Sequence, residues 1–129
     1  RELYLDNNPD LTGTLPSKLD VLQTLQSLSI TGCGLTGTIP PEIGMLNASV
    51  FQNLLLYNNT LTGTIPPNLG NLYQLENIEI EGNMITGDVP VELCINTSPY
   101  GSLKRLEVDC NEGVTCTCCT CCGERCIEG

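Results

Sequence analysis

The stretch LTGTIPPEIGML, residues 35 to 46, returns in modified form along the whole chain. LTGTLP begins at Leu11, LTGTIP begins again at Leu61, and ITGDVP begins at Ile85. The four starting positions are spaced by 24, 26 and 24 residues. A regular period of this length indicates a solenoid of stacked copies, because one copy cannot bury its apolar residues alone.

A second block precedes each copy and has the pattern of a short strand with one buried face. Its apolar residues alternate with other residues, as in Leu28-x-Ile30 and Ile78-x-Ile80. A polar residue follows at the turn, and its buried amide is expected to bind backbone groups of neighbouring turns in a ladder. The ladder residues are Asn8, Asn59 and Asn83, with Cys33 in the same place in the second copy.

Together the two blocks read L-x-x-L-x-L-x-x-N/C-x-L followed by LTGTIPPEIGML or LTGTIPPNLGNL. This repeat resembles the plant-type leucine-rich repeat consensus LTGxIPxxLGxL over nearly the whole chain, in about four and a half copies. The resemblance implies an α/β solenoid, a right-handed leucine-rich repeat superhelix with short parallel strands on the concave face and little helix. We expect repeats over residues 1–109 and a disulfide-rich C-terminal cap over residues 110–129.

The first copy lacks the opening of the pattern, and nothing polar or rich in cysteine precedes it. A solenoid that started there would expose a strand edge and apolar core residues. We therefore expect this N-terminal edge to pack against further repeats or another subunit.

Cysteines crowd the last part of the chain, where CTCCTCC occupies residues 116 to 122. Terminal caps of secreted repeat proteins are often stabilised by disulfides. Of the nine cysteines, Cys33 takes a ladder position, which leaves eight candidates for four disulfides. The eight are Cys94, Cys110, Cys116, Cys118, Cys119, Cys121, Cys122 and Cys126. Their pairing stays open, because eight cysteines allow about 105 arrangements.

Adjacent cysteines restrict the pairing geometry. Cys118 and Cys119 point to opposite sides of an extended chain, so we expect one to bind the repeats and the other the tail. Cys94 and Cys110 are the expected anchors in the repeats. A metal-binding tail is the alternative, disfavoured because the chain has no His and no second cysteine pair at the usual spacing. The C-x-x-C from Cys116 to Cys119 lacks the surrounding pattern of a redox fold.

The tail DCNEGVTCTCCTCC also resembles the cysteine-dense cap that closes certain algal leucine-rich repeat proteins, which implies an oxidising, extracytoplasmic setting. Three glycosylation sequons favour the same setting, at Asn47, Asn58 and Asn96. Asn47 and Asn96 fall in connecting segments, and we favour them over Asn58, where a glycan would crowd the adjacent ladder residue Asn59. We expect a location that is secreted, at the cell surface or in an organelle lumen.

Residues that flank the buried leucines are expected to line the concave face in three columns. An apolar and aromatic group comprises Tyr4, Leu55 and Tyr57, the residue types that anchor interfaces. An acidic group comprises Glu79, Glu81, Glu107 and Asp109. The functional interpretation is a surface for a basic or partly aromatic protein partner, and the alternative is a solvated face that maintains solubility. Calcium is disfavoured there, because carboxylates on a sheet lack the looped cage of calcium sites.

Composition excludes several functions. With 15 acidic and 5 basic residues, the chain is too acidic to bind nucleic acid through its phosphates. No apolar run reaches the roughly 20 residues needed to span a bilayer. Without His there is no Ser-His-Asp or Cys-His arrangement, so we expect no enzyme and no cofactor.

Threonines on the convex side offer a further possibility. Thr12-x-Thr14, Thr36-x-Thr38 and Thr62-x-Thr64 are expected to stack into two ladders that resemble the flat faces of ice-binding solenoids. The sequence therefore favours a non-catalytic protein-interaction module of receptor-ectodomain or scaffold type. The alternatives are a structural subunit of a larger assembly, a metal-binding tail and an ice-binding convex face.

Overall fold

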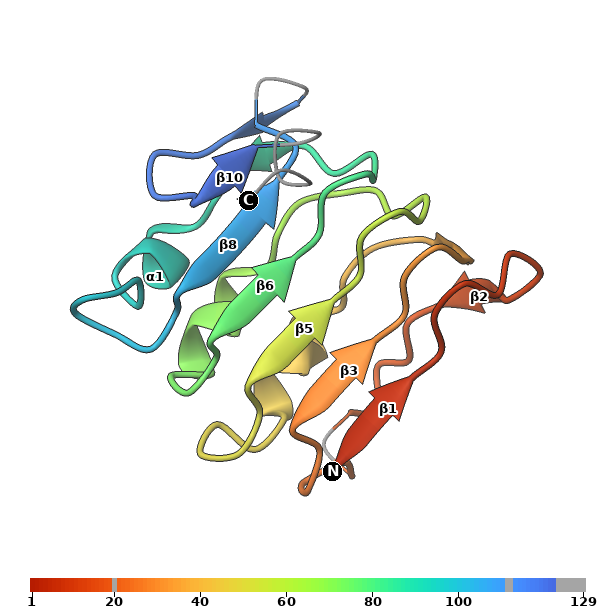
Figure 1. The fold of residues 1–129 in the computed structure, drawn as a ribbon, viewed down its shortest axis with the longest axis horizontal. Helices are drawn as coiled ribbons and strands as arrows, with labels where there is room; N and C mark the ends of the chain where they lie inside the picture. The colour runs from red at the N-terminus through yellow and green to blue at the C-terminus, as the bar shows by residue number, and fades with distance from the viewer. Residues whose placement is uncertain (20, 111–112, 123–129) are drawn as a thin grey trace.

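The computed structural model describes residues 1–19, 21–110 and 113–122. Six parallel strands form one sheet, and Figure 1 shows them side by side in the order β1-β3-β5-β6-β8-β10. The strands are β1 (Glu2–Tyr4), β3 (Ser27–Ser29), β5 (Asn53–Leu55), β6 (Asn77–Glu79), β8 (Arg105–Val108) and β10 (Cys121–Cys122). The chain adds one strand to this sheet with each repeat, so the expected leucine-rich repeat solenoid is confirmed.

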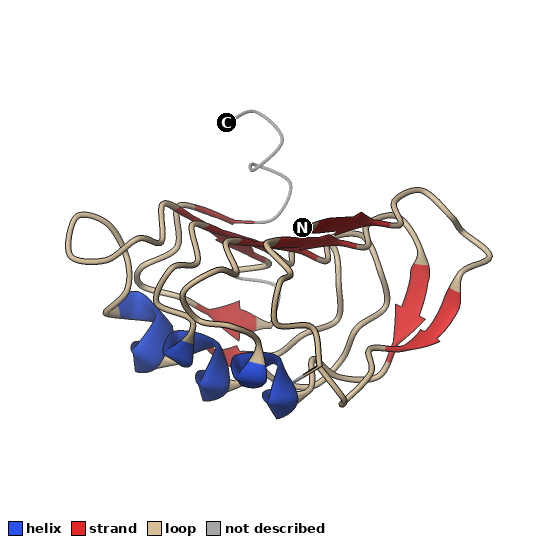
Figure 2. Cartoon of the chain, turned by 90° about the horizontal axis from the view of Figure 1, so that it is seen from below, coloured by secondary structure: helices blue, strands red, loops and turns tan. Residues whose placement is uncertain are grey.

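Short helices and a second set of strands line the side of the solenoid opposite the sheet (Figure 2). The elements there are β2 (Thr12–Thr14), β4 (Gly34–Thr36), η1 (Pro41–Met45), η2 (Pro67–Asn71), β7 (Gly87–Asp88), α1 (Val91–Cys94) and β9 (Val114–Thr115). A proline begins η1 and another begins η2, because the first helical position needs no N–H donor and suits the fixed φ of proline. The helices have only four or five residues each, so the prediction of little helix is confirmed.

The apolar core runs through the solenoid as a stack. Leu28, Leu54, Ile78 and Leu106 occupy equivalent positions in adjacent strands, and none is more than 4% exposed. Leu3 pairs with Leu28 in β1 but is 40% exposed, because β1 is the edge strand of the sheet. The core is therefore closed in the middle repeats and open at β1.

The predicted polar ladder is present beneath the sheet. The Nδ2 atom of Asn59 donates to the carbonyls of Ile30 and Leu56 at 2.7 and 3.0 Å, and its Oδ1 atom accepts from the Leu35 backbone N–H at 3.2 Å. Asn83 repeats the arrangement one turn further along. The Cys33 thiol donates to the Leu5 carbonyl at 3.0 Å, so a cysteine takes over part of the same role.

The convex threonines do not form the two ladders expected from the sequence. Thr14 pairs with Thr36, and Thr38 pairs with Thr62, so each copy is shifted by two residues against the next. The cause is glycine: the methyl groups of three threonines lie over glycines of the following copy. These pairs are Thr14 over Gly37, Thr38 over Gly63 and Thr64 over Gly87. Threonine stacks on glycine here, and equivalent threonines are not aligned.

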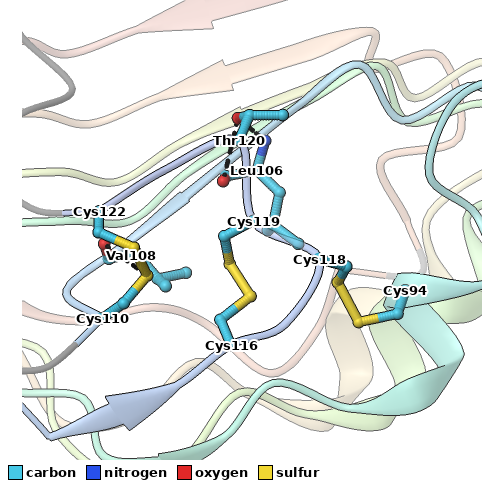
Figure 3. The surroundings of a disulfide bond; sticks show 9 residues. All are labelled: Cys94, Leu106, Val108, Cys110, Cys116, Cys118, Cys119, Thr120 and Cys122. Atoms are coloured by element: carbon cyan, nitrogen blue, oxygen red, sulfur yellow. Dashed lines mark hydrogen bonds between the residues drawn. A yellow bond between two sulfur atoms is a disulfide. The ribbon is translucent and has the colours of Figure 1, made fainter.

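The cap continues the sheet. Its strand β10 pairs in parallel with β8, with Cys121 opposite Glu107 and Cys122 opposite Val108. Just before β10, Thr120 hydrogen-bonds to both backbone groups of Leu106 (Figure 3). The cap thereby satisfies backbone groups of the last repeat strand as well as covering its apolar residues.

Disulfides fix the cap in place, as Figure 3 shows. The bonds among the described residues are Cys94–Cys118, Cys110–Cys122 and Cys116–Cys119. Adjacent cysteines therefore diverge, since Cys118 is bonded to the repeats and Cys119 to the tail. Cys126 and the side chain of Cys121 lie outside the described residues. Cys33 is a free thiol.

Candidate partner-binding face

The register of the sheet sets the columns of its outward face. Tyr4, Ser29, Leu55, Glu79 and Glu107 are paired across five adjacent strands. A neighbouring column is joined by side-chain hydrogen bonds: Asn77 donates to Asn53 Oδ1 at 2.5 Å, and Asn53 donates to Ser27 Oγ at 2.8 Å. Hydrogen bonds thus link the neighbouring side chains of this second column across three adjacent strands.

Three predicted acidic residues converge on this face. One carboxylate oxygen from each of Glu79, Glu81 and Glu107 lies within 4.8 Å of the other two. Glu107 is only 3% exposed, and Arg105 Nε lies 2.6 Å from its Oε1 atom. The Arg105 guanidinium therefore pairs with one of three converging carboxyl groups, which we call the acidic cluster (Glu79, Glu81 and Glu107).

Two carboxyl groups of the acidic cluster, those of Glu79 and Glu81, have a raised pKa and hold their protons more tightly than ordinary carboxylates. Burial is the main cause that raises the pKa of Glu81 from its usual 4.5 to about 8, with the charges of Glu107 and Glu79 adding to it. Burial, followed by the charge of Glu107, also raises the pKa of Glu79, while Arg105 acts in the opposite direction. The Oε2 atom of Glu81 is buried without a hydrogen-bond partner among the described residues.

Asp109 has a different environment from the acidic cluster. Its Oδ1 atom accepts from the Gly82 backbone N–H at 3.0 Å, and its Oδ2 atom accepts from that of Asn83 at 3.1 Å. With 7% exposure, it ties its own turn to the preceding repeat. The structure therefore places Asp109 in the scaffold beside the cluster.

Asp6 plays a similar part at the other end of the solenoid. Burial opposes ionisation of this carboxyl group, but hydrogen bonds from Ser29 and from Thr31 together hold its pKa below the usual value. Asp6 and Asp109 are therefore carboxylates that tie neighbouring repeats together.

The aromatic and apolar residues are brought together only in part. Leu55 pairs directly with Glu79, so an apolar side chain adjoins the acidic cluster, and Tyr57 is half-buried beyond it. Tyr4 is 56% exposed on β1, and Ser29 stands between it and Leu55. The structure thus divides the predicted group into Leu55 with Tyr57, and Tyr4 alone.

Arg105 is the site residue that sequence reasoning missed as a partner of the acidic cluster. The signal for it was present, since Arg105 and Glu107 are two residues apart in β8 and therefore share a face of the strand. Only the distance between their side chains shows that this arginine neutralises part of the cluster.

The stacked strands, the polar ladder and the outward columns define a leucine-rich repeat solenoid. The Leucine Rich Repeat family model matches residues 24–46 and 51–72. The fold is similar to the ectodomain of the plant membrane receptor kinase GASSHO1/SCHENGEN3 from Arabidopsis thaliana (TM-score 0.76, 34% identity, 90% of this chain and 13% of that chain). It is also similar to the BIR2 ectodomain from Arabidopsis thaliana (TM-score 0.72, 31% identity, 82% of this chain and 52% of that chain).

A plant ice-binding protein has a similar fold as well (TM-score 0.71, 25% identity, 89% of this chain and 34% of that chain). The chain therefore spans only part of the length of these relatives. No curated protein sequence matches it significantly. Among the described residues, no helix has the length and apolar character needed to cross a membrane.

Proposed function

We propose that this domain is a non-catalytic recognition module that binds a protein or peptide partner on the outward face of its sheet. A cationic group of the partner, an ammonium or a guanidinium, enters the acidic cluster. An apolar side chain of the partner lies on Leu55 and Tyr57. The observation that carries the proposal is the convergence of three carboxyl groups beside Leu55, with one arginine to balance them.

Charge complementarity favours a basic occupant. A cation that replaces the bound protons can donate hydrogen bonds to several carboxylate oxygens at once, and partial burial strengthens those contacts. Leu55 and Tyr57 supply the apolar area that a charged group alone lacks, as at the centres of other interfaces. One of the similar structures is a receptor ectodomain in complex with CASPARIAN STRIP INTEGRITY FACTOR 2, which agrees with this kind of function.

The compartment follows from the cap. Three disulfides within the described residues are stable in an oxidising setting, which supports a domain that works outside the cytosol. We assign the repeats to the LTGxIP class over residues 1–109, and the cap to the type found in algal leucine-rich repeat proteins over residues 110–129. The continuous sheet makes the two a single structural unit.

The test is selection of a random peptide library on the immobilised domain, followed by affinity measurement with the enriched peptides. The expected result is enrichment of Arg or Lys next to an apolar or aromatic residue. The double variant Glu79→Gln and Glu81→Gln should bind these peptides at least about tenfold more weakly, since two charge-assisted contacts are lost. Tyr57→Ala should weaken the same peptides without removing their preference for basic residues.

The matched control is Glu92→Gln, which removes an exposed carboxylate from α1 on the other side of the solenoid. It should leave the affinity unchanged. Enrichment of peptides without basic residues, or equal weakening by Glu92→Gln, would contradict the proposal. Addition of Ca²⁺ separates a metal site from a peptide site, because a metal-dependent cluster would bind peptide only when the ion is present.

A second candidate role is a fixed subunit of a larger assembly. The observation in its favour is the edge strand β1, where Leu3 and Leu5 are 40% and 37% exposed although their equivalents Leu28 and Ile30 are 4% and 7% exposed. A further leucine-rich strand would cover them and pair with the free edge. Sedimentation of the isolated domain measures its oligomeric state. A stable monomer at high concentration contradicts this role. If the domain does associate, Leu3→Lys should return it to a monomer.

A further inference from the structure

The three glycosylation sequons differ in what the acceptor side chain does. The Nδ2 atom of Asn47 donates to the Gln23 carbonyl at 3.2 Å, and the Nδ2 atom of Asn96 donates to the Gly70 carbonyl at 2.9 Å. Both nitrogens therefore bind the backbone of the preceding repeat, and both residues are partly buried. A glycan at either position would sit on the nitrogen of a partly buried residue, against the preceding repeat, and would leave that nitrogen a single N–H for its carbonyl contact.

Asn58 is arranged in a different way. It is exposed at the corner that follows Tyr57, with a left-handed φ of 57°, a conformation that asparagine tolerates better than most residues. Its side-chain oxygen lies over Gly82 of the next repeat. Its side-chain nitrogen donates no hydrogen bond to any residue that the structure describes. The sequon threonine, Thr60, is exposed and donates to the Leu35 carbonyl at 2.8 Å.

We propose that Asn58 carries an N-linked glycan and that Asn47 and Asn96 remain unmodified. A sugar on exposed Asn58 replaces an amide hydrogen that none of the described residues accepts, so the inter-repeat contacts stay intact. This reverses the order of preference that the sequence suggests. The ladder residue Asn59 points into the stack and bonds to Ile30 and Leu56, so a glycan on its neighbour does not crowd it.

The glycan would border the proposed partner-binding face. Asn58 directly follows Tyr57, and its backbone N–H donates to the Glu81 carbonyl at 3.0 Å, so it adjoins the rim nearest the acidic cluster. A bulky polar group there limits the approach of a large partner from that rim. A glycan on Asn58 leaves room for an extended peptide that crosses the columns of the sheet on the side of Tyr57 away from Asn58.

The experiment is secretion of the chain from a eukaryotic host behind a signal peptide, followed by intact mass and glycopeptide analysis. Thr60→Ala removes the Asn58 sequon and should lower the mass by one glycan, whereas Thr60→Ser keeps the sequon and should retain the glycan. Ser49→Ala and Ser98→Ala remove the other two sequons and should leave the mass unchanged. Asn58→Gly suits the left-handed backbone and provides a second variant that should lose the same mass.

An unmodified Asn58 in the secreted protein would overturn the proposal. A glycan lost from Ser49→Ala or Ser98→Ala would overturn its selectivity. The proposal rests on the extracytoplasmic location inferred above. Thiol alkylation without reductant tests that location separately from the modification of Asn58. Bridged cysteines with no glycan on Asn58 would refute the modification alone, whereas free cysteines would refute the location.

Discussion

The side-chain oxygen of Asn58 occupies the space that a Cβ atom on Gly82 would need. The same relationship joins Asn7 to Gly32, where a Cβ atom would lie 2.8 Å from the asparagine Oδ1. All four residues have a left-handed backbone at the corner after a sheet strand. Asparagine and glycine thus alternate from repeat to repeat, because each asparagine side chain needs a glycine beneath it.

Gly82→Ala should destabilise the domain by about 2–3 kcal/mol, since alanine suffers both the left-handed strain and the collision with Asn58. In an Asn58→Gly background the collision is gone, and the cost should fall to about 1 kcal/mol. Urea unfolding of the four proteins in this double-mutant cycle measures both values. Equal costs in the two backgrounds would show that the side chain of Asn58 does not restrict Gly82.

Asn59→Ala should cost about 3 kcal/mol of unfolding free energy, because it removes the side-chain partner of the Ile30 carbonyl and of the Leu35 N–H inside the stack, and one of the two asparagine bonds to the Leu56 carbonyl. Asn8→Ala removes an exposed member of the same ladder and should cost less than about 1 kcal/mol. Chemical denaturation of both variants checks the contrast. Similar losses for the two variants would mean that burial does not determine how much a ladder asparagine contributes to the free energy of unfolding.

The free energy of unfolding should fall as the pH rises from about 5 to about 8.5. The folded state raises the pKa of Glu81 to about 8, so it holds a proton that the unfolded chain releases near pH 4.5. One such proton changes stability by at most about 1.4 kcal/mol per pH unit. Glu81→Gln should flatten the profile, while Glu92→Gln should not. A profile of Glu81→Gln parallel to that of the parent would exclude Glu81 as its source.

Removal of single disulfides should reduce stability in the order of the chain length that each one closes. The bonds Cys94–Cys118, Cys110–Cys122 and Cys116–Cys119 span 24, 12 and 3 residues. Loop-closure entropy then gives losses of about 3.5, 3 and 2 kcal/mol when each pair is changed to alanine. Denaturation under non-reducing conditions measures them. A larger loss for Cys116–Cys119 than for Cys94–Cys118 would show that local packing outweighs chain entropy.

The repeat period determined most of what the sequence could predict. It placed Leu28, Leu54 and Ile78 in one buried row and Asn59 in the ladder, because both follow from a strand that recurs at a nearly fixed interval. It failed where packing departs from sequence equivalence: Thr14 lies beside Thr36 because its methyl group packs over Gly37. Repeat periodicity aligns positions, but side-chain volume sets the final register.

The sequence predicted which residues form the outward columns of the sheet, but not the contacts that their side chains make. The sequence could not show that the Asp109 carboxylate accepts hydrogen bonds from the backbone N–H groups of Gly82 and Asn83, because those bonds depend on the geometry of a turn. It also could not show that Cys121 and Cys122 add a sixth strand, because this short segment has none of the alternation found in the repeats.

The contrast between the two ends of the sheet gives the molecule a direction. At one end the disulfides Cys94–Cys118 and Cys110–Cys122 and the strand β10 hold the last repeat, and at the other β1 is an edge strand with exposed leucines. In a stack where each copy touches only its neighbours, opening begins where the fewest contacts must break. In the isolated domain of residues 1–129, amide exchange should therefore be fastest in β1 and slow progressively toward β8, so that opening proceeds from β1 toward the cap.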